Sequence, residues 1–387
     1  SIGAIWSSSS PDFGIKGVLD RFTQIKPKVL FAANGYFYNG KEFNSLEKLN
    51  SILDKLPSVD QVVITPFTES NPDISSVNNG ILWNDFLDSD PSTIKFEQLP
   101  FDHPLYIMYS SGTTGLPKSI VHGAGGTLLQ HLKELRLHTN ISQDDTVFYF
   151  TTCGWMMWNW LVSNLAIGAT IVLYDGTPFY PSPNAMWDMV DELGITHFGT
   201  SAKFIDACRQ EGLSPTNTNS LETLRTILST GSPLVEESFD YVYNQIKSDV
   251  QLASISGGTD IISCFAGGSP TLPVYRGELQ CIGLGMDVAA FDLKGNAMEN
   301  EKGELVCRKA FPSMPIYFWN DPEGKKYRNA YFNQYPGIWH HGDFIEVNRH
   351  GGVTIFGRSD ATLNPGGIRI GTAEIYRVVD AFDEVAD

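Results

Sequence analysis

A run of small and hydroxyl residues in the first third of the chain has the composition of a phosphate-binding loop. It follows an apolar stretch that predicts a strand over residues 105–109 and ends at a lysine. Glycines let backbone N–H groups approach phosphate oxygens, hydroxyls donate further hydrogen bonds, and a lysine adds a charge that can follow a polyphosphate. The candidate phosphate ligands are Ser110, Ser111, Gly112, Thr113, Thr114, Gly115 and Lys118.

This loop differs from the Walker A loop of GTPases and many kinases. That loop has the pattern GxxxxGK[ST], whereas here Pro117 stands where the second glycine is required. The plain alternative is a surface loop without a ligand, because clusters of Ser, Thr and Gly are usually loops. The pattern favours a nucleotide phosphate loop of another kind, which we expect to lead into a helix over residues 127–137.

Four further motifs follow the loop in order along the chain. They lie at residues 229–233, 256–260, 341–343 and 357–360. Together with the loop, they resemble the motifs of the adenylate-forming acyl-CoA synthetase superfamily, and they span nearly the whole chain. Five motifs in the family's order make a chance match negligible.

The resemblance implies a nucleotide site with an adenine-side turn, a segment near the α-phosphate, and an Asp and an Arg at the ribose. An Asp carboxylate can accept hydrogen bonds from both ribose hydroxyls, and an Arg offers a planar fork of donors. Taken singly, Asp343 also fits an ordinary turn, and Arg358 fits a solvated surface charge. The implied nucleotide ligands beyond the loop are Gly231, Ser232, Pro233, Ser256, Gly257, Gly258, Thr259, Asp343, Arg358 and Arg369.

The resemblance assigns catalysis to Lys118, Thr259 and Asp260, and places Asp260 at a Mg²⁺ ion. The family more often has Glu at the last position. The shorter Asp can still reach the ion, directly or through a water, because Mg²⁺ keeps several waters in proteins. The alternative is that Asp260 only caps a short helix that begins at Ile261.

A cluster of large apolar residues is the candidate acyl pocket. In acetyl-specific members of the family, two Trp residues stand where this chain has Ser256 and Gly257, and the second closes the pocket floor. We therefore expect an open floor that accepts an acid larger than acetate. The alternative is that Trp and Met at this spacing are ordinary helix core. The implied pocket residues are Trp155, Met156, Met157, Thr230 and Gly257.

The last motif implies a hinge and the start of a mobile C-terminal domain. Asp360 resembles the family's hinge residue, and Gly367 and Arg369 resemble residues that contact CoA after that domain swings. The family places its adenylation lysine there, yet no lysine follows Lys326. We expect this stretch alone to bind nucleotide but to release pyrophosphate poorly. The sequence at both ends has the pattern of buried elements, and this pattern favours a fragment of a longer chain.

The implied reaction joins an acid to a thiol in two steps. The acid attacks ATP to form an acyl-adenylate and pyrophosphate, and CoA then takes the acyl group and releases AMP. The implied substrates are ATP, CoA and acetoacetate or a similar small carboxylate, with Mg²⁺ as cofactor. Two alternatives stay open: a ligase for another short or medium-chain acid, and a nucleotide-binding protein without catalysis.

Composition limits the partners. The formal net charge of −17 argues against nucleic acid and anionic membrane surfaces as partners. The sequence contains no run of 18 apolar residues, so it predicts no membrane span. The five cysteines are widely spaced without CxxC pairs, which favours a reducing, cytosolic location. Nothing in the pattern indicates an oligomeric state.

Alternating strand and helix patterns predict an α/β fold with doubly wound parallel sheets. Near residue 277 the pattern of predicted elements changes to short strands separated by Gly and Asn. This pattern favours a smaller antiparallel or barrel-like subdomain. The expected organisation is a nucleotide- and acyl-binding core, a β-rich subdomain, a hinge and the start of a C-terminal domain. These units are expected at residues 1–275 (incomplete at the N-terminus), 276–357, 358–360 and 361–387.

Overall fold

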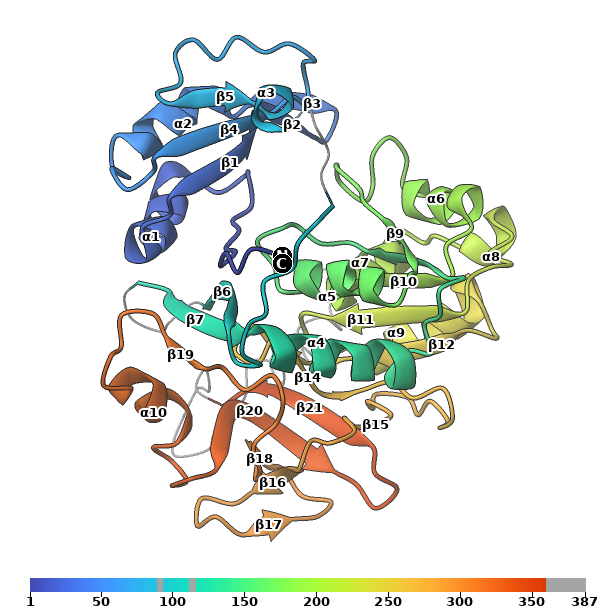
Figure 1. The fold of residues 1–387 in the computed structure, drawn as a ribbon. Helices are drawn as coiled ribbons and strands as arrows, with labels where there is room; N and C mark the ends of the chain where they lie inside the picture. The colour runs from blue at the N-terminus through green and yellow to red at the C-terminus, as the bar shows by residue number, and fades with distance from the viewer. Residues whose placement is uncertain (89–92, 111–115, 360–387) are drawn as a thin grey trace, which may run out of the picture.

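The computed structural model describes residues 1–88, 93–110 and 116–359. Figure 1 shows three parts: a small N-terminal α/β unit at the top, a parallel sheet with its helices at the right, and an antiparallel sheet at the bottom. The α/β class with a β-rich part is therefore confirmed, whereas the exact domain boundaries stay a prediction.

The N-terminal unit is a three-stranded parallel sheet with the strand order β1-β4-β5. Helices α1 and α2 pack on it through a small apolar core. The side chain of Asn44 accepts a hydrogen bond of 2.8 Å from the backbone N–H of Leu46 just before α2. The elements are α1 (Ile15–Ile25), β1 (Val29–Ala33), β2 (Gly35–Tyr38), β3 (Lys41–Asn44), α2 (Leu46–Leu53), β4 (Gln61–Thr65), β5 (Gly80–Leu82) and α3 (Trp83–Phe86).

The central sheet has five parallel strands in the order β12-β11-β10-β8-β9. The order reverses between β8 and β10, and such a switch point is where α/β sheets bind ligands. Helix α6 of this part ends at Gly194, whose φ of +61° is the left-handed conformation that often follows a helix. The elements are β8 (Thr146–Tyr149), α5 (Met157–Val162), η2 (Ser163–Ala166), β9 (Thr170–Val172), α6 (Ala185–Leu193), β10 (His197–Ser201), α7 (Ala202–Gln210), α8 (Pro215–Thr218), β11 (Thr226–Thr230), α9 (Glu236–Tyr241), η3 (Val242–Ile246) and β12 (Gln251–Ser254).

The phosphate loop joins two antiparallel strands, β6 (Pro104–Ser110) and β7 (Lys118–Gly123). A helix is confirmed over the expected residues 127–137, but strand β7 separates it from the loop. Ile120 and Val121 of β7 are fully buried, and burial on both faces suits these β-branched residues to a strand. Helix α4 (Ala124–Lys133) follows β7 and continues as the π-helical turn η1 (Glu134–His138).

The C-terminal part is a five-stranded antiparallel sheet with the order β17-β16-β18-β20-β21. The change to antiparallel strands after residue 277 is therefore confirmed. Trp339 of β20 stacks on Tyr331 in the core beneath this sheet. The elements from β13 onward are β13 (Ser256–Gly258), β14 (Ser263–Gly267), β15 (Cys281–Ile282), β16 (Val288–Phe291), β17 (Ala297–Met298), β18 (Gly303–Cys307), β19 (Tyr317–Phe318), α10 (Lys325–Tyr331), β20 (Trp339–Val347) and β21 (Val353–Arg358).

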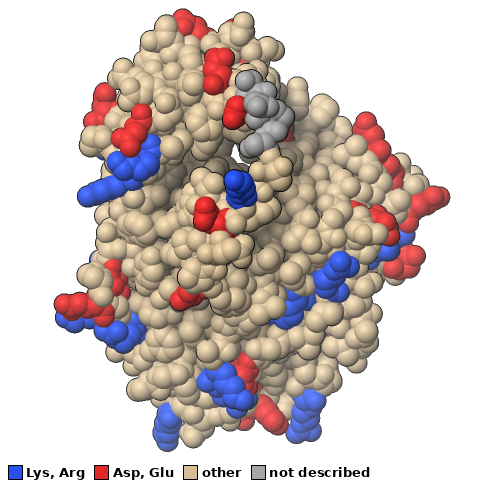
Figure 2. Space-filling model, viewed as in Figure 1, with Lys and Arg blue, Asp and Glu red and all other residues tan. Residues whose placement is uncertain are grey.

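Charged side chains are spread over the visible face in small groups of both signs (Figure 2). Among the described residues, no helix has the length and apolar character needed to cross a membrane. The five cysteines are free; Cys208, Cys264 and Cys307 are buried, whereas Cys153 and Cys281 are partly exposed.

Candidate nucleotide and acyl site

A cavity of about 420 Å³ opens at the carboxyl ends of β11 and β12. Ligands of α/β proteins usually bind at this edge of a sheet. The strands β20 and β21 close the other side, so segments far apart in sequence meet in one wall. The predicted site residues in that wall are Trp155, Met156, Met157, Thr230, Gly231, Ser232, Pro233, Ser256, Gly257, Gly258, Thr259, Asp260, Asp343 and Arg358.

The remaining predicted residues fall into two groups. Ser110 and Lys118 are paired across β6 and β7, at the two ends of the phosphate loop. The others lie outside the described residues: Ser111, Gly112, Thr113, Thr114, Gly115, Asp360, Gly367 and Arg369.

Asp343 and Arg358 face each other across β20 and β21. A nitrogen of the Arg358 guanidinium, Nη1, lies 3.6 Å from Asp343 Oδ1, and His341 Nε2 lies 3.6 Å from Asp343 Oδ2. Asp343 is buried, whereas the Arg358 side chain is 47% exposed. The pair therefore holds a carboxylate at the cavity wall and an extended fork of donors beside it, which suits a vicinal diol.

His341 is buried beside this pair, and its ring packs edge-on against Phe265. Burial lowers the pKa of His341, although the negative charge of Asp343 opposes the shift. The imidazole is therefore neutral at neutral pH and adds no positive charge to the nucleotide site.

Asp260 accepts hydrogen bonds from Lys118 and from the hydroxyl of Tyr331. Lys118 Nζ lies 2.6 Å from Asp260 Oδ1. Burial acts to raise the pKa of Asp260, but the charge of Lys118 and these hydrogen bonds bring it below its usual value. The carboxylate is thus ionised at neutral pH. Two of the three predicted catalytic residues, Lys118 and Asp260, thus form an ion pair.

Residues 259–262 form a turn between β13 and β14 rather than the start of a helix. The alternative that Asp260 only caps a helix is therefore wrong. His122 of β7 contacts this turn: its Nε2 lies 3.1 Å from the carbonyl oxygen of Thr259. Burial lowers the pKa of His122 to about 4, so the ring is neutral.

The apolar wall comes from the segment after β8 and from α5. Tyr149 makes edge contacts with Trp155 and Trp160, at centroid distances of 5.9 and 6.0 Å. Met156 and Met157 are buried in the core cluster under this wall and also line the cavity. These residues therefore belong to the core and also line the cavity, and their contact with an acyl group stays a prediction.

Gly257 has a structural reason that the sequence did not reveal. A Cβ atom on this residue would lie 2.0 Å from the carbonyl oxygen of Ser263 and 2.4 Å from Cys264 Cα. Such a side chain would point at the backbone of β14, which pairs with β13, and not into the cavity. The glycine therefore permits the close approach of two strands, so the missing side chain at this position does not by itself open the pocket floor.

Several wall residues escaped the sequence analysis because they belong to no motif. Glu134, Trp160, Ser263 and Cys264 line the cavity near the apolar wall. The one available signal was a charged Lys133–Glu134 pair inside an otherwise amphipathic helix pattern. Within residues 1–88, 93–110 and 116–359, no group of three or more His, Cys, Asp or Glu is arranged to hold a metal ion.

Comparison with known proteins gives consistent matches. The family model described as AMP-binding enzyme matches residues 1–318. The chain is 57% identical over 395 residues to acetoacetyl-CoA synthetase of Gallus gallus, and 56% identical over 389 residues to acetoacetyl-coenzyme A synthetase of Rhizobium meliloti (strain 1021). These matches cover all of this chain and 59% and 60% of those proteins.

A solved structure agrees with the sequence matches. Acetoacetyl-CoA synthetase from Streptomyces lividans aligns with a TM-score of 0.93 and 45% identity, over 100% of this chain and 59% of that chain. The chain thus spans about three fifths of the length of these relatives. The family model covers most of the chain, in agreement with the motifs described above, and the chain belongs to the AMP-binding enzyme family.

Proposed function

We propose that this chain forms the nucleotide- and acyl-binding part of an ATP-dependent acid–thiol ligase that activates acetoacetate. The observation that carries the proposal is the shared cavity: the Asp343–Arg358 pair and an apolar wall around Trp155 line the same space. One space can then hold a nucleotide and a short acyl group together. The names of the most similar relatives support acetoacetate as the acid.

In the first step, a carboxylate oxygen of the acid attacks the α-phosphorus of ATP. A new O–P bond forms, the bond to pyrophosphate breaks, and the acyl-adenylate results. The protein's part is to position the two reactants and to neutralise charge on the phosphate oxygens. Asp343 and Arg358 hold the ribose, whereas Lys118, Thr259 and the backbone N–H groups of the loop serve the phosphates.

The residues present fit a Mg²⁺ ion. This ion binds through one or two carboxylates together with substrate phosphates and waters, and Asp260 supplies an ionised carboxylate beside Thr259. When bound, Mg²⁺ would neutralise charge on the phosphates of ATP. Lys118 pairs with Asp260 in this structure, and we expect its ammonium group to turn to the phosphates when the nucleotide binds.

In the second step, the thiol of CoA attacks the carbonyl carbon of the acyl-adenylate. The thiol loses its proton, a C–S bond forms, and the C–O bond to AMP breaks. By family resemblance, Asp360 is the hinge for this step and Gly367 and Arg369 contact CoA. A cytosolic location is part of the same proposal, because five free cysteines suit a reducing compartment.

The test is an acid panel on the complete gene product with ATP, Mg²⁺ and CoA. AMP release is measured with acetate, propionate, butyrate, 3-hydroxybutyrate and acetoacetate. We expect the highest kcat/KM with acetoacetate. If another acid leads, the ligase proposal stands and the substrate is wrong. If no acid releases AMP, the protein binds nucleotide without catalysing this reaction.

A further inference from the structure

A buried glutamate lies at the apolar side of the cavity, and the mechanism above does not use it. Glu134 is the first residue of the π-helical turn η1 that continues α4, and its side chain is 3% exposed. π-Helical turns within helices are frequent at functional sites. Glu134 lines the cavity together with Trp160, Ser263 and Cys264.

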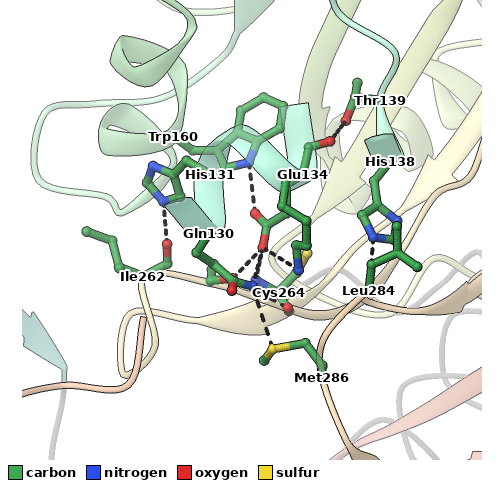
Figure 3. A network of polar contacts seen from close by, with 12 residues as sticks. Gln130, His131, Glu134, His138, Thr139, Trp160, Ile262, Cys264, Leu284 and Met286 are labelled. Carbon is green, nitrogen blue, oxygen red and sulfur yellow. Dashed lines mark hydrogen bonds and ion pairs between the residues drawn. The ribbon is translucent and has the colours of Figure 1, made fainter. Parts of the chain in front are cut away.

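The Glu134 carboxylate is surrounded by hydrogen-bond donors (Figure 3). Its Oε1 accepts from Gln130 Nε2 at 2.9 Å and from the hydroxyl of Ser263. Its Oε2 accepts from the indole N–H of Trp160 at 3.1 Å. Both carboxylate oxygens of Glu134 therefore have hydrogen-bond donors from the protein.

These contacts fix the wall of the acyl site. The indole of Trp160 is held between Glu134 and the ring of Tyr149. Ser263 also accepts a hydrogen bond of 2.8 Å from Gln130 Nε2, so its hydroxyl is oriented as well. The wall that meets the acyl group is therefore apolar along Met156 and Met157 and polar at Glu134 and Ser263.

We propose that Glu134 is the specificity-determining residue of the acyl site: it selects short acids with a polar group near their distal end and rejects longer saturated acids. The inference rests on the function proposed above. A longer alkyl chain would lie against a buried carboxylate and exclude water from it, which is costly in an apolar environment. A hydroxyl group on a four-carbon acid can instead donate to the carboxylate, and a water that donates to Glu134 can also donate to an oxo group.

A purely structural role makes a different prediction. Glu134 also ties α4 to β14 through Ser263, so its loss will lower stability in either case. A residue that only supports the fold would lower kcat/KM for all acids by the same factor. A residue that determines specificity changes the ratio between acids.

The experiment measures kcat/KM for acetoacetate, butyrate and hexanoate in the complete gene product and in three variants. Glu134→Met keeps the length and removes the charge, Glu134→Gln keeps the shape, and Trp160→Phe removes the indole N–H together with the pyrrole part of the ring. We expect the acetoacetate-to-butyrate ratio to fall about tenfold in Glu134→Met, with hexanoate gaining relative to both. The other two variants should shift the ratio less, in the same direction.

A matched control separates specificity from folding. Glu304 is another buried carboxylate, hydrogen-bonded to His340 at 3.0 Å, and it is not among the residues that line the cavity. Glu304→Gln should lower the melting temperature and leave the ratio unchanged. Unchanged ratios in Glu134→Gln and Trp160→Phe would overturn the inference even if Glu134→Met does not fold. Absence of turnover in the unmodified protein would overturn the proposed function instead.

Discussion

Asp343 and Arg358 place a carboxylate and a guanidinium group beside each other at the wall of the cavity. The motifs placed both residues at the ribose, and the structure sets them opposite each other on β20 and β21, with Arg358 Nη1 at 3.6 Å from Asp343 Oδ1. Glu134 was not predicted, because a single Glu in a helix pattern does not show which side chains from distant segments will surround it.

The Arg358 guanidinium should be required for nucleotide affinity. Replacing it by Lys removes the planar fork of donors while keeping the charge, so we expect AMP and ATP to bind about tenfold more weakly in Arg358→Lys. Isothermal titration calorimetry measures the dissociation constants. Arg308→Lys is the matched control, since Arg308 is similarly exposed and pairs with Asp287 away from the cavity. Equal affinities for the two variants would contradict the ribose assignment.

Lys118 should control the pH dependence of activity through Asp260. Lys118 is the strongest of the groups that lower the pKa of Asp260 against the effect of burial. In Lys118→Gln burial dominates, so the pKa of Asp260 rises and the carboxylate is protonated at a higher pH. We expect the acid limb of kcat/KM for ATP to move to higher pH, on top of a loss of rate at all pH values. A lower rate with an unmoved acid limb would show that Asp260 has no part in the step.

At the scale of elements, the short strands after residue 277 followed from their Gly and Asn punctuation in the sequence. Strand β7 did not, because its six residues combine a buried apolar centre with a lysine and a glycine at its ends. A short sequence of this composition also fits a loop. It forms a strand because it pairs with β6 and β19. The same limit applies to Gly257, whose role depends on a neighbouring strand.

Gly257 should be required for the close approach of β13 and β14. A Cβ atom there would lie 2.0 Å from the carbonyl oxygen of Ser263, so one of the two strands must move in Gly257→Ala. We expect the free energy of unfolding to fall by about 1–3 kcal/mol, measured by urea denaturation. Gly267→Ala on β14 is the control, because its Cβ would meet only Cys264 Sγ at 3.7 Å. Equal stabilities of the two variants would contradict the structural role of Gly257.

At the scale of the whole molecule, composition and periodicity predicted the α/β class, but not the cavity. Its wall joins Glu134, Trp155, Gly231, Gly257 and Arg358, which only the packing of three sheets brings together. The family resemblance supplied this long-range information for the motif residues alone. The polar part of the acyl wall therefore had to come from the structure.

Two buried histidines should make the stability of the whole protein depend on pH. Burial lowers the pKa of His122 and of His197 to about 4, from an ordinary value of 6.5. The unfolded chain therefore binds more protons between these values, and stability is lost as the pH falls from 6.5 toward 4. Each histidine contributes a slope of roughly 1.4 kcal/mol per pH unit within that window.

Urea unfolding at pH 6.5, 5.5 and 4.5 measures this slope. In His122→Gln the free energy of unfolding should be lower at pH 6.5 but should fall less steeply on acidification. A slope identical to that of the unmodified protein would show that His122 is not held neutral in the folded state.

The most direct test of the proposed reaction follows one oxygen atom. The complete gene product is given acetoacetate labelled with ¹⁸O in its carboxylate, together with ATP, Mg²⁺ and CoA. If the carboxylate attacks the α-phosphorus, each turnover leaves one ¹⁸O atom in AMP and none in pyrophosphate. Label in inorganic phosphate, or AMP that forms without label, would contradict the account.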